Sequence, residues 1–321
     1  MSRVVVISLC VLTILGDVIS AEAGAPSPFE IGSGVRQISL GGAFVAMADD
    51  STAAFWNPAG MGAMKNPEMR LEGRLKTLGS NLITLSGAYP AEGQGTIGFS
   101  GLYYNSGPAD SYTESGLKLG TFSDRRMALA TGVGYKSGPF YIGGSGFYLW
   151  QGMRGEGIAD SGSGYGIMLG AIYQADESLR LGAAFRSKTK LKWSDGVEEE
   201  VPPSARIGLL YSFKNYDSTF RVAADLIQVK GEPLRLAIGA EMAGEEEGNA
   251  FFIRGGVADV YIEGGKTGLP PGELTKLSIK PAMGFGFRWR LSGGEALLFD
   301  YALRFEPTGM KHFISVGYRV E

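Results

Sequence analysis

From residue 67 onward, the sequence alternates apolar and polar side chains with a period of two residues. In residues 205–213, for example, Leu209 and Tyr211 fall on one face of an extended strand, and Arg206 falls on the other. A period of two indicates strands with one apolar and one polar face. This pattern restricts most of the chain to antiparallel β architectures.

Fourteen such segments follow one another, and most are about ten residues long. A tilted strand needs about 9–11 residues to cross a bilayer, whereas strands of soluble sheets are usually shorter. The fourteen strands are therefore expected to be membrane-spanning. They are residues 67–77, 82–90, 94–105, 125–136, 139–150, 163–174, 178–187, 203–213, 218–227, 233–243, 249–260, 278–291, 296–305 and 310–320.

The links between these strands differ in length according to parity. The even-numbered links are short, and the odd-numbered ones include nearly all the long ones, at residues 106–124, 151–162, 188–202 and 261–277. Outer-membrane barrels have short turns on one rim and long loops on the other, whereas a soluble Greek-key sandwich has no reason to sort its loops in this way. We therefore predict an all-β fold, a transmembrane antiparallel up-and-down barrel of about 14 strands.

The polar strand face then lines the lumen and carries charges of both signs. Isolated charges in a narrow barrel would be costly, whereas cross-strand pairs of opposite sign offset that cost. We interpret most of these charges as structural filling rather than ligand contacts. The predicted lumen-lining residues are Arg70, Glu72, Arg74, Arg206, Arg221, Asp225, Arg235, Glu241, Arg288, Asp300 and Arg304, and the same register also places the charges of Arg180, Arg186 and Arg254 in the lumen.

The N-terminus has the three parts of a secretory signal peptide. Arg3 is followed by an apolar run at residues 4–15 and by the small-x-small motif Ala21-Glu22-Ala23. The predicted division is a signal peptide at 1–23, an N-terminal segment at 24–66 and a barrel at 67–321. The only cysteine, Cys10, lies in the predicted signal peptide, which leaves the mature chain without a disulfide or thiolate. After export, we expect a multi-pass location in a Gram-negative-type bacterial outer membrane.

The sequence offers little support for an enzyme or a nucleic-acid-binding protein. The net charge is −3 with mixed signs, so no field for a polyanion is expected. The single histidine, His312, lies in the last strand and has no nucleophile motif beside it. We predict no catalytic residues, no metal site and no cofactor. The adjacent pair Asp49-Asp50 could form a carboxylate dyad, but capping of a helix end or turn is the preferred interpretation.

Residues 39–61, SLGGAFVAMADDSTAAFWNPAGM, differ from the alternating part of the chain. Leu40, Phe44 and Met47 lie at helical spacing, so a short small-residue helix is expected, followed by a turn at Asn57-Pro58. Small residues suit tight packing inside a lumen. The alternative is an extension that lies outside the barrel on the periplasmic side.

This segment resembles the N-terminal signature of the FadL-type long-chain fatty acid and hydrocarbon transporters, and more closely that of their PorV/PorQ-like relatives. Residues 202–213, 220–242, 251–257, 298–305 and 311–319 also resemble PorV-like proteins, so the likeness covers nearly the whole mature chain. It implies a hatch at 34–64 that plugs the lumen and a lateral route for apolar substrates. The residues implied for the hatch and its gating are Gly41, Gly42, Phe44, Asp49, Asp50, Trp56, Asn57, Pro58, Ala59 and Gly60.

Three functional hypotheses follow. The first is uptake of a hydrophobic small molecule, of the long-chain fatty acid or hydrocarbon type, gated by the hatch. The partners would then be outer-membrane lipids and a hydrophobic ligand or detergent in the lumen. The second is a PorV-like protein that binds secreted cargo proteins through its long loops and hands them to a surface-anchoring machinery. The third is a soluble periplasmic β-protein. Nucleic acid is not an expected partner of any of them.

Overall fold

The structure is a computed structural model, and it describes residues 33–77, 80–91, 93, 95–112, 116–155, 158–261, 279–306 and 309–321. The predicted signal peptide at 1–23 and the beginning of the N-terminal segment lie outside the described residues. Most of the predicted long link at 261–277 also lies outside them.

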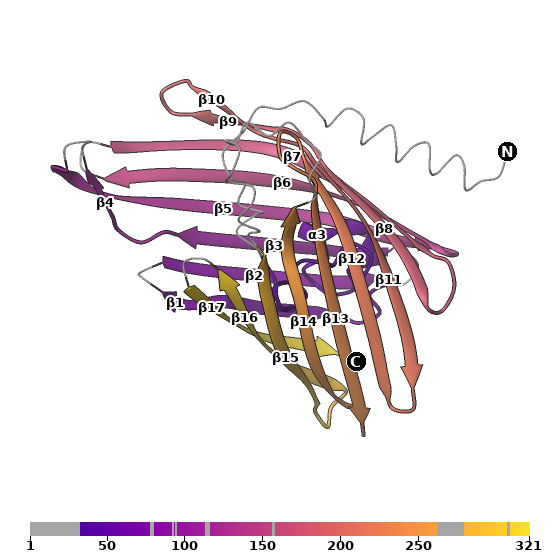
Figure 1. The fold of residues 1–321 in the computed structure, drawn as a ribbon. Helices are drawn as coiled ribbons and strands as arrows, with labels where there is room; N and C mark the ends of the chain where they lie inside the picture. Colours follow the sequence, from indigo (N-terminus) through magenta and orange to yellow (C-terminus); the bar gives the residue numbers. More distant parts are fainter. Residues whose placement is uncertain are drawn as a thin grey trace.

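The described strands form one antiparallel sheet that closes on itself (Figure 1). The first strand, β1 (Glu68–Thr77), pairs with the last, β17 (Gly309–Val320), from Glu68 opposite Arg319 to Arg74 opposite Phe313. Fourteen strands form the wall, which confirms the predicted barrel. The other twelve are β2 (Ser80–Ala91), β3 (Gly95–Asn105), β5 (Lys118–Ser137), β6 (Phe140–Gly155), β7 (Ile158–Gln174), β8 (Leu179–Arg186), β11 (Ser204–Asn215), β12 (Ser218–Val229), β13 (Arg235–Glu246), β14 (Asn249–Tyr261), β15 (Lys280–Arg290) and β16 (Glu295–Glu306).

The two ends of the barrel differ as the link lengths predict. At one end, here named the short-turn end, all six links between successive strands contain two to four residues. The opposite end, named the long-loop end, carries the long connections, which include the hairpin β9 (Thr189–Trp193) and β10 (Glu198–Val201).

Three of the predicted long loops, at residues 106–124, 151–162 and 188–202, are strands over much of their length, which corrects the sequence prediction. The strands β5, β6 and β7 extend past their neighbours in Figure 1, and β4 (Ala109–Tyr112) pairs with the extension of β5. The residues predicted as the loop 188–202 contain the whole β9–β10 hairpin, in which the ladder joins Thr189 to Val201. Paired strands can continue beyond the width of a bilayer, because their backbone N–H and C=O groups bond to each other in water as well as in lipid.

The two faces of the wall have opposite character. Outward-facing side chains are large and apolar, including Leu71 at 57 % exposure, Ile97 at 59 % and Val133 at 56 %. Inward-facing neighbours such as Glu72 and Ser100 are buried. A soluble monomer rarely exposes an apolar surface of this extent, so the outer face is suited to lipid. Among the described helices, none has the length and apolar character needed to cross a membrane.

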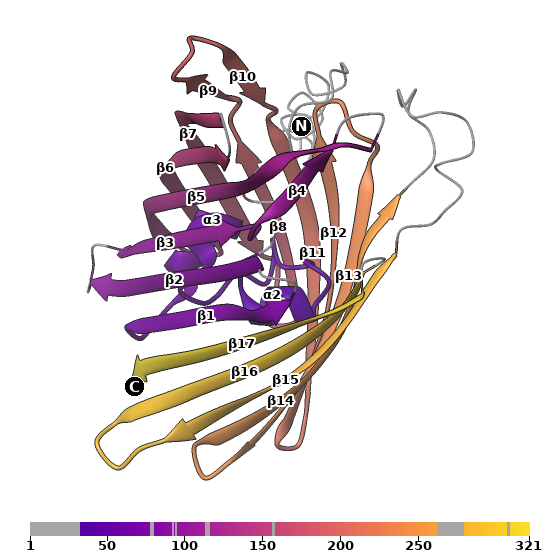
Figure 2. The same ribbon diagram turned by 90° about the vertical axis from the view of Figure 1, so that its left-hand side faces the viewer.

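Residues 33–66, here named the luminal segment, lie inside the barrel, where Figure 2 shows their helices surrounded by strands. They form α2 (Val35–Ser39), α3 (Ala53–Trp56) and the 3-10 helix η2 (Pro58–Ala63). The helix expected around Leu40 to Met47 is wrong, because this stretch is a series of turns. Gly41 and Gly42 have φ angles of 65° and 82°, a left-handed conformation that ends α2.

Inward-facing glycines bring the wall into contact with the backbone of the luminal segment. A Cβ atom on Gly143 of β6 would overlap Pro58, and one on Gly182 of β8 would lie 2.6 Å from the Cα of Ala46. Gly256 of β14 faces Leu40 in the same way. These positions on several strands form a belt where any side chain would collide with the segment. The chain's 50 glycines are thus partly explained by close packing.

Candidate functional site

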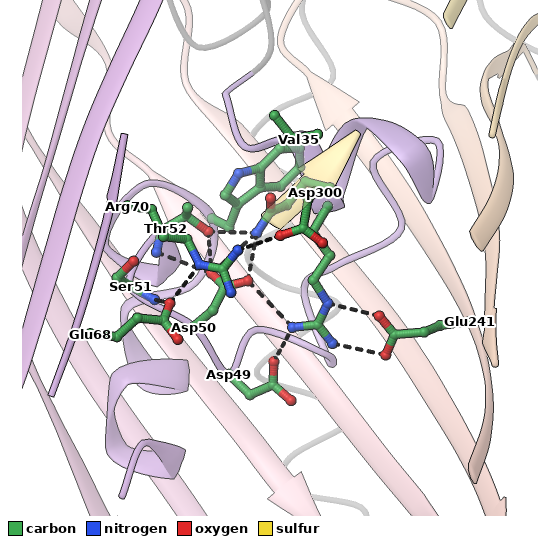
Figure 3. Close-up of polar contacts among 12 residues, drawn as sticks. Val35, Asp49, Asp50, Ser51, Thr52, Glu68, Arg70, Glu241 and Asp300 are labelled. Carbon is green, nitrogen blue, oxygen red and sulfur yellow. Dashed lines mark hydrogen bonds and ion pairs between the residues drawn. The ribbon is translucent and has the colours of Figure 1, made fainter. Parts of the chain in front are cut away.

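The luminal segment is bound to the wall by a buried network of arginines and carboxylates, drawn in Figure 3. Arg36 of α2 donates to Glu241 of β13 from Nε (2.9 Å) and Nη2 (3.1 Å). Its Nη1 contacts Asp49 at 2.5 Å and Asp50 at 3.3 Å. Glu241 also accepts from Arg254 of β14 at 2.7 Å and from Arg221 of β12 at 2.8 Å. One buried carboxylate therefore joins three arginines, one from the luminal segment and two from the wall.

The network continues across the strands that close the barrel. Asp300 of β16 accepts from Arg254 at 2.5 Å and from Arg70 of β1 at 2.6 Å. Arg70 also contacts Glu68 at 2.7 Å, and Glu68 binds Arg319 of β17 at 2.6 Å. Buried charges of this kind are tolerated when each has a partner of opposite sign. The structure thus pairs the predicted lumen residues Arg70, Arg221, Glu241 and Asp300.

Two further carboxylates, together with Glu68 of the network, accept hydrogen bonds from backbone N–H groups of the luminal segment. Both Phe44 and Val45 donate to one oxygen of Asp225, at 2.8 and 2.9 Å. Val35 donates to Glu72 at 3.1 Å, and Ser51 donates to Glu68 at 3.1 Å. These bonds satisfy donors at turns and at the start of α2 that have no partner within a helix.

The adjacent aspartates of the segment differ in their environment. Asp50 is fully buried and accepts from the backbone N–H of Thr52 at 3.0 Å, so it stabilises the turn before α3. Burial, helped by the negative charges of Glu68 and Asp49, raises the pKa of Asp50 against the opposing charges of Arg70 and Arg36. Burial also acts to raise the pKa of Asp49, but Arg36 and Arg221 outweigh it and bring that pKa below its usual value. The pair is therefore not an equivalent dyad, and Asp50 has the predicted turn-stabilising role.

The Asn57-Pro58 turn connects the luminal segment to the opposite side of the wall. The side chain of Asn57 accepts from Ala59 N–H at 3.1 Å, which caps η2, and donates to Val45 O at 2.8 Å. It also donates to Ala171 O of β7 at 3.4 Å. Gly60 packs so closely on the backbone of Ala48 that a Cβ atom would not fit. The N-P-A-G motif therefore fixes the fold of the segment and its contact with β7.

A narrow pocket, here named the long-loop pocket, lies between the luminal segment and the long-loop end. It is lined by apolar side chains including Phe55, Trp56 and Ile227, together with Arg206 and Arg235. Its volume is about 30 Å³, roughly a tenth of the lower limit of about 300 Å³ for small-molecule sites. Trp56 stands edge-on to Phe44, with ring centroids 6.0 Å apart, and Arg206 lies 4.9 Å from the Trp56 ring.

A larger cavity of about 290 Å³, the short-turn cavity, opens on the other side of the segment. Arg36 and Asp49 reach it from the segment, and Arg180 and Arg288 reach it from the wall. Arg288 is placed here by ion pairs to Glu245 at 3.1 Å and Glu321 at 3.5 Å. The two spaces are separated by the luminal segment.

The remaining predicted lumen residues lie toward the long-loop end. Arg74 donates to Ser80 at 2.6 Å, and Arg304 forms an ion pair with Glu306 and lies 5.4 Å from the ring of Phe313. Arg235 contacts Asp259 at 3.2 Å. None of the three joins the Arg36 network in the part of the chain that the structure describes.

Sequence reasoning did not select three members of the network: Arg36, Glu68 and Arg319. Arg254 was among the predicted lumen charges, and the strand register agrees, because Glu241 lies directly opposite Arg254 on β14 and Arg221 on β12. Opposite charges at one level of three neighbouring strands predict a shared ion pair. Arg36 had no comparable signal, since its partner Glu241 is 205 residues away.

The described residues contain no group of three or more His, Cys, Asp or Glu side chains arranged to hold a metal ion. The sequence matches no protein-family model, and no curated protein matches it.

Solved structures with a similar fold are bacterial channels. The toluene transporter TodX of Pseudomonas putida is 13% identical, with a TM-score of 0.59 over 94% of this chain and 99% of that one. The CymD monoaromatic hydrocarbon channel is 14% identical, with a TM-score of 0.62 over 91% and 98%. A FadL homologue of Pseudomonas aeruginosa is 11% identical, with a TM-score of 0.62 over 93% and 99%. This chain therefore has the FadL-type barrel fold.

Proposed function

We propose that this protein is an outer-membrane channel for hydrophobic small molecules, and that passage requires movement of the luminal segment. The observation that carries the proposal is a closed barrel, apolar on its outside, whose lumen is filled by residues 33–66. The fold is shared with a toluene transporter and a monoaromatic hydrocarbon channel, which supports the class of substrate. An outer-membrane location belongs to the same proposal.

The long-loop pocket supports this proposal and gives the reason for movement. Trp56 and Phe55 supply apolar surface there, which suits an apolar or aromatic solute. At about 30 Å³, however, the pocket is too small for a hydrocarbon in this conformation, since small-molecule sites begin at about 300 Å³. The described wall offers no evident bypass, since each of its fourteen strands pairs with both neighbours. The solute must therefore displace the luminal segment or open the wall.

A reversible cross-link tests the role of the segment. The hydroxyl oxygens of Ser51 in the segment and Ser86 on β2 lie 2.9 Å apart, so cysteines at both positions can form a disulfide. The only native cysteine, Cys10, lies in the predicted signal peptide. We expect the oxidised Ser51→Cys/Ser86→Cys protein to block uptake of labelled toluene or fatty acid into proteoliposomes, and we expect reductant to restore it.

The single Ser51→Cys variant is the matched control and should be insensitive to oxidation. Equal uptake by the oxidised and reduced double variant would show that the segment need not move away from β2. If empty liposomes and liposomes with the wild-type protein take up both labelled compounds at the same rate, the proposed channel function is wrong.

The shuttle of secreted proteins remains the alternative, and its assignment to the PorV/PorQ-like branch rests on sequence resemblance alone. The described part of its expected binding surface includes the β9–β10 hairpin, where Lys190 and Glu198 form an exposed ion pair at 2.6 Å. Purification from native membranes separates the two proposals, because stoichiometric co-purification of a secreted protein would favour the shuttle and a bound hydrophobic molecule would favour the channel.

A further inference from the structure

The short-turn cavity has a charge composition unlike that of an apolar passage. Eight of its lining side chains are arginine or lysine, and three are aspartate or glutamate. At about 290 Å³ it is nearly ten times larger than the long-loop pocket, and it lies close to the lower limit of about 300 Å³ for small-molecule sites.

Most of these cations already form ion pairs with carboxylates of the buried network. Arg36, Arg221 and Arg254 share Glu241, and Arg70 contacts Glu68 and Asp300. These ion pairs have a structural role, because they hold the luminal segment in the barrel. The paired arginines alone therefore give no reason to expect a ligand.

Two lining cations form no such pair within the described part of the chain. Arg180 of β8 contacts neutral groups, because it donates to Gln174 and lies 5.9 Å from the ring of Tyr141. Lys65 is exposed at the end of the luminal segment and forms no ion pair among the described residues. These two cations give the cavity positive charge that no carboxylate among the described residues neutralises.

We propose that the short-turn cavity binds a small oxyanion, a carboxylate or a phosphate. Guanidinium and ammonium groups converging on a concave space bind such oxygens through charge-assisted hydrogen bonds. The anion could be the head group of an amphiphile leaving the barrel or a free anion from the solution at this end. The site goes beyond the proposed channel function, since binding here requires no transport.

Calorimetric titration of the full-length protein in zwitterionic-lipid nanodiscs tests the proposal, because both ends of the barrel are then accessible. The probes are inorganic phosphate, hexanoate and the uncharged hexanol. We expect phosphate or hexanoate to bind, added salt to weaken the binding, and hexanol to bind no better than it does to empty nanodiscs. Tighter binding of hexanoate, with displacement of phosphate, would identify an amphiphile head group. Binding of phosphate alone would identify a free anion.

The test variant is Lys65→Gln/Arg180→Gln, and the matched control is Lys190→Gln/Lys192→Gln on β9, which removes two charges at the opposite end of the barrel. The test variant should lose at least about tenfold in anion affinity, roughly the contribution of one charge-assisted hydrogen bond. The control should stay within about twofold of wild type. If Arg180→Gln prevents folding, the exposed Lys65→Gln substitution alone is used.

The proposal is overturned if neither anion binds, if hexanol binds as well as hexanoate, or if the test and control variants bind the anion equally well. Because the assay measures binding, a failure here is distinguishable from a failure of uptake in liposomes.

Discussion

The luminal segment is held in two different ways on its two sides. Toward β1, β13, β14, β16 and β17, buried arginines and carboxylates bind it, with Arg36 at the centre. Toward β5 to β8, inward-facing glycines let the wall touch its backbone around Pro58 and Ala46. The first side combines charge with the close contact of Gly256 to Leu40, whereas the second depends on shape. Removal of a charge on one side and addition of a methyl group on the other should therefore release the same segment.

The largest effect is expected on the charged side. Glu241→Gln leaves Arg36, Arg221 and Arg254 without their shared carboxylate. Removing one partner of a buried ion pair costs about 3–5 kcal/mol. We expect a lower melting temperature in detergent and tryptic cleavage after Arg36, which is buried inside the barrel in the wild-type protein.

The control for this prediction is Glu198→Gln on β10, which removes an exposed ion pair with Lys190. Its melting temperature should equal that of wild type within error. Protection of Arg36 from trypsin in the Glu241→Gln variant would show that the charged side is dispensable.

A smaller effect is expected on the glycine side, from Gly143→Ala. The added methyl group would overlap the backbone of Pro58, and overpacking of this kind costs about 1–3 kcal/mol. The neighbouring Gly144→Ala is a matched control, because its Cβ atom would meet Leu169 at an ordinary 3.5 Å. Cleavage after Arg36 should increase in the first variant alone, and equal cleavage in both would contradict packing as the cause.

The smallest effect is expected from the two aspartates, and it depends on pH. The pKa of Asp49 is lowered in the folded protein, so its charge stabilises the fold at neutral pH, and this stabilisation is lost as pH falls through the lowered pKa. The pKa of Asp50 is raised, so its stabilising contribution is present at low pH and is lost as pH rises through the raised pKa.

We therefore expect Asp49→Asn to lower the melting temperature at neutral pH, with a difference that shrinks in acid below about pH 4. At neutral pH, Asp50→Asn should lower the melting temperature less than Asp49→Asn does, or should raise it above that of the wild-type protein. As the pH falls, the wild-type Asp50 carboxyl becomes protonated and the wild-type protein gains stability, so the Asp50→Asn variant should compare less favourably with it. Melting curves of both variants across this pH range check the signs. Parallel curves for the two variants would contradict the different environments of the two carboxylates.

The wall could be predicted from sequence because its determinants are local. Alternation with period two sets the faces of each strand, and the short turns set their order, so the fourteen strands and most lumen charges were predictable. Strand ends were less predictable, since the extensions of β5 to β7 depend on a neighbouring partner strand.

The luminal segment was harder to predict because its structure depends on distant residues. Leu40, Phe44 and Met47 have helical spacing, but Gly41 and Gly42 end the helix, and Asp225 binds the N–H groups that a helix would have used. The glycines of the wall are visible in the sequence, yet only the closed barrel shows which of them face Pro58 and Ala46. The proposed gating role of the N-P-A-G motif stays a prediction.

The long separation between Arg36 and Glu241 has a consequence for how the protein is assembled. The luminal segment precedes every strand in the chain, but its main ionic partner is on β13, and β1 finds its closing partner only in β17. Contacts this distant in sequence form slowly, because the loop between them must first be closed. The luminal segment, which is synthesised before the described strands, is therefore among the last parts to be fixed, and secure closure of the lumen marks the completion of the barrel.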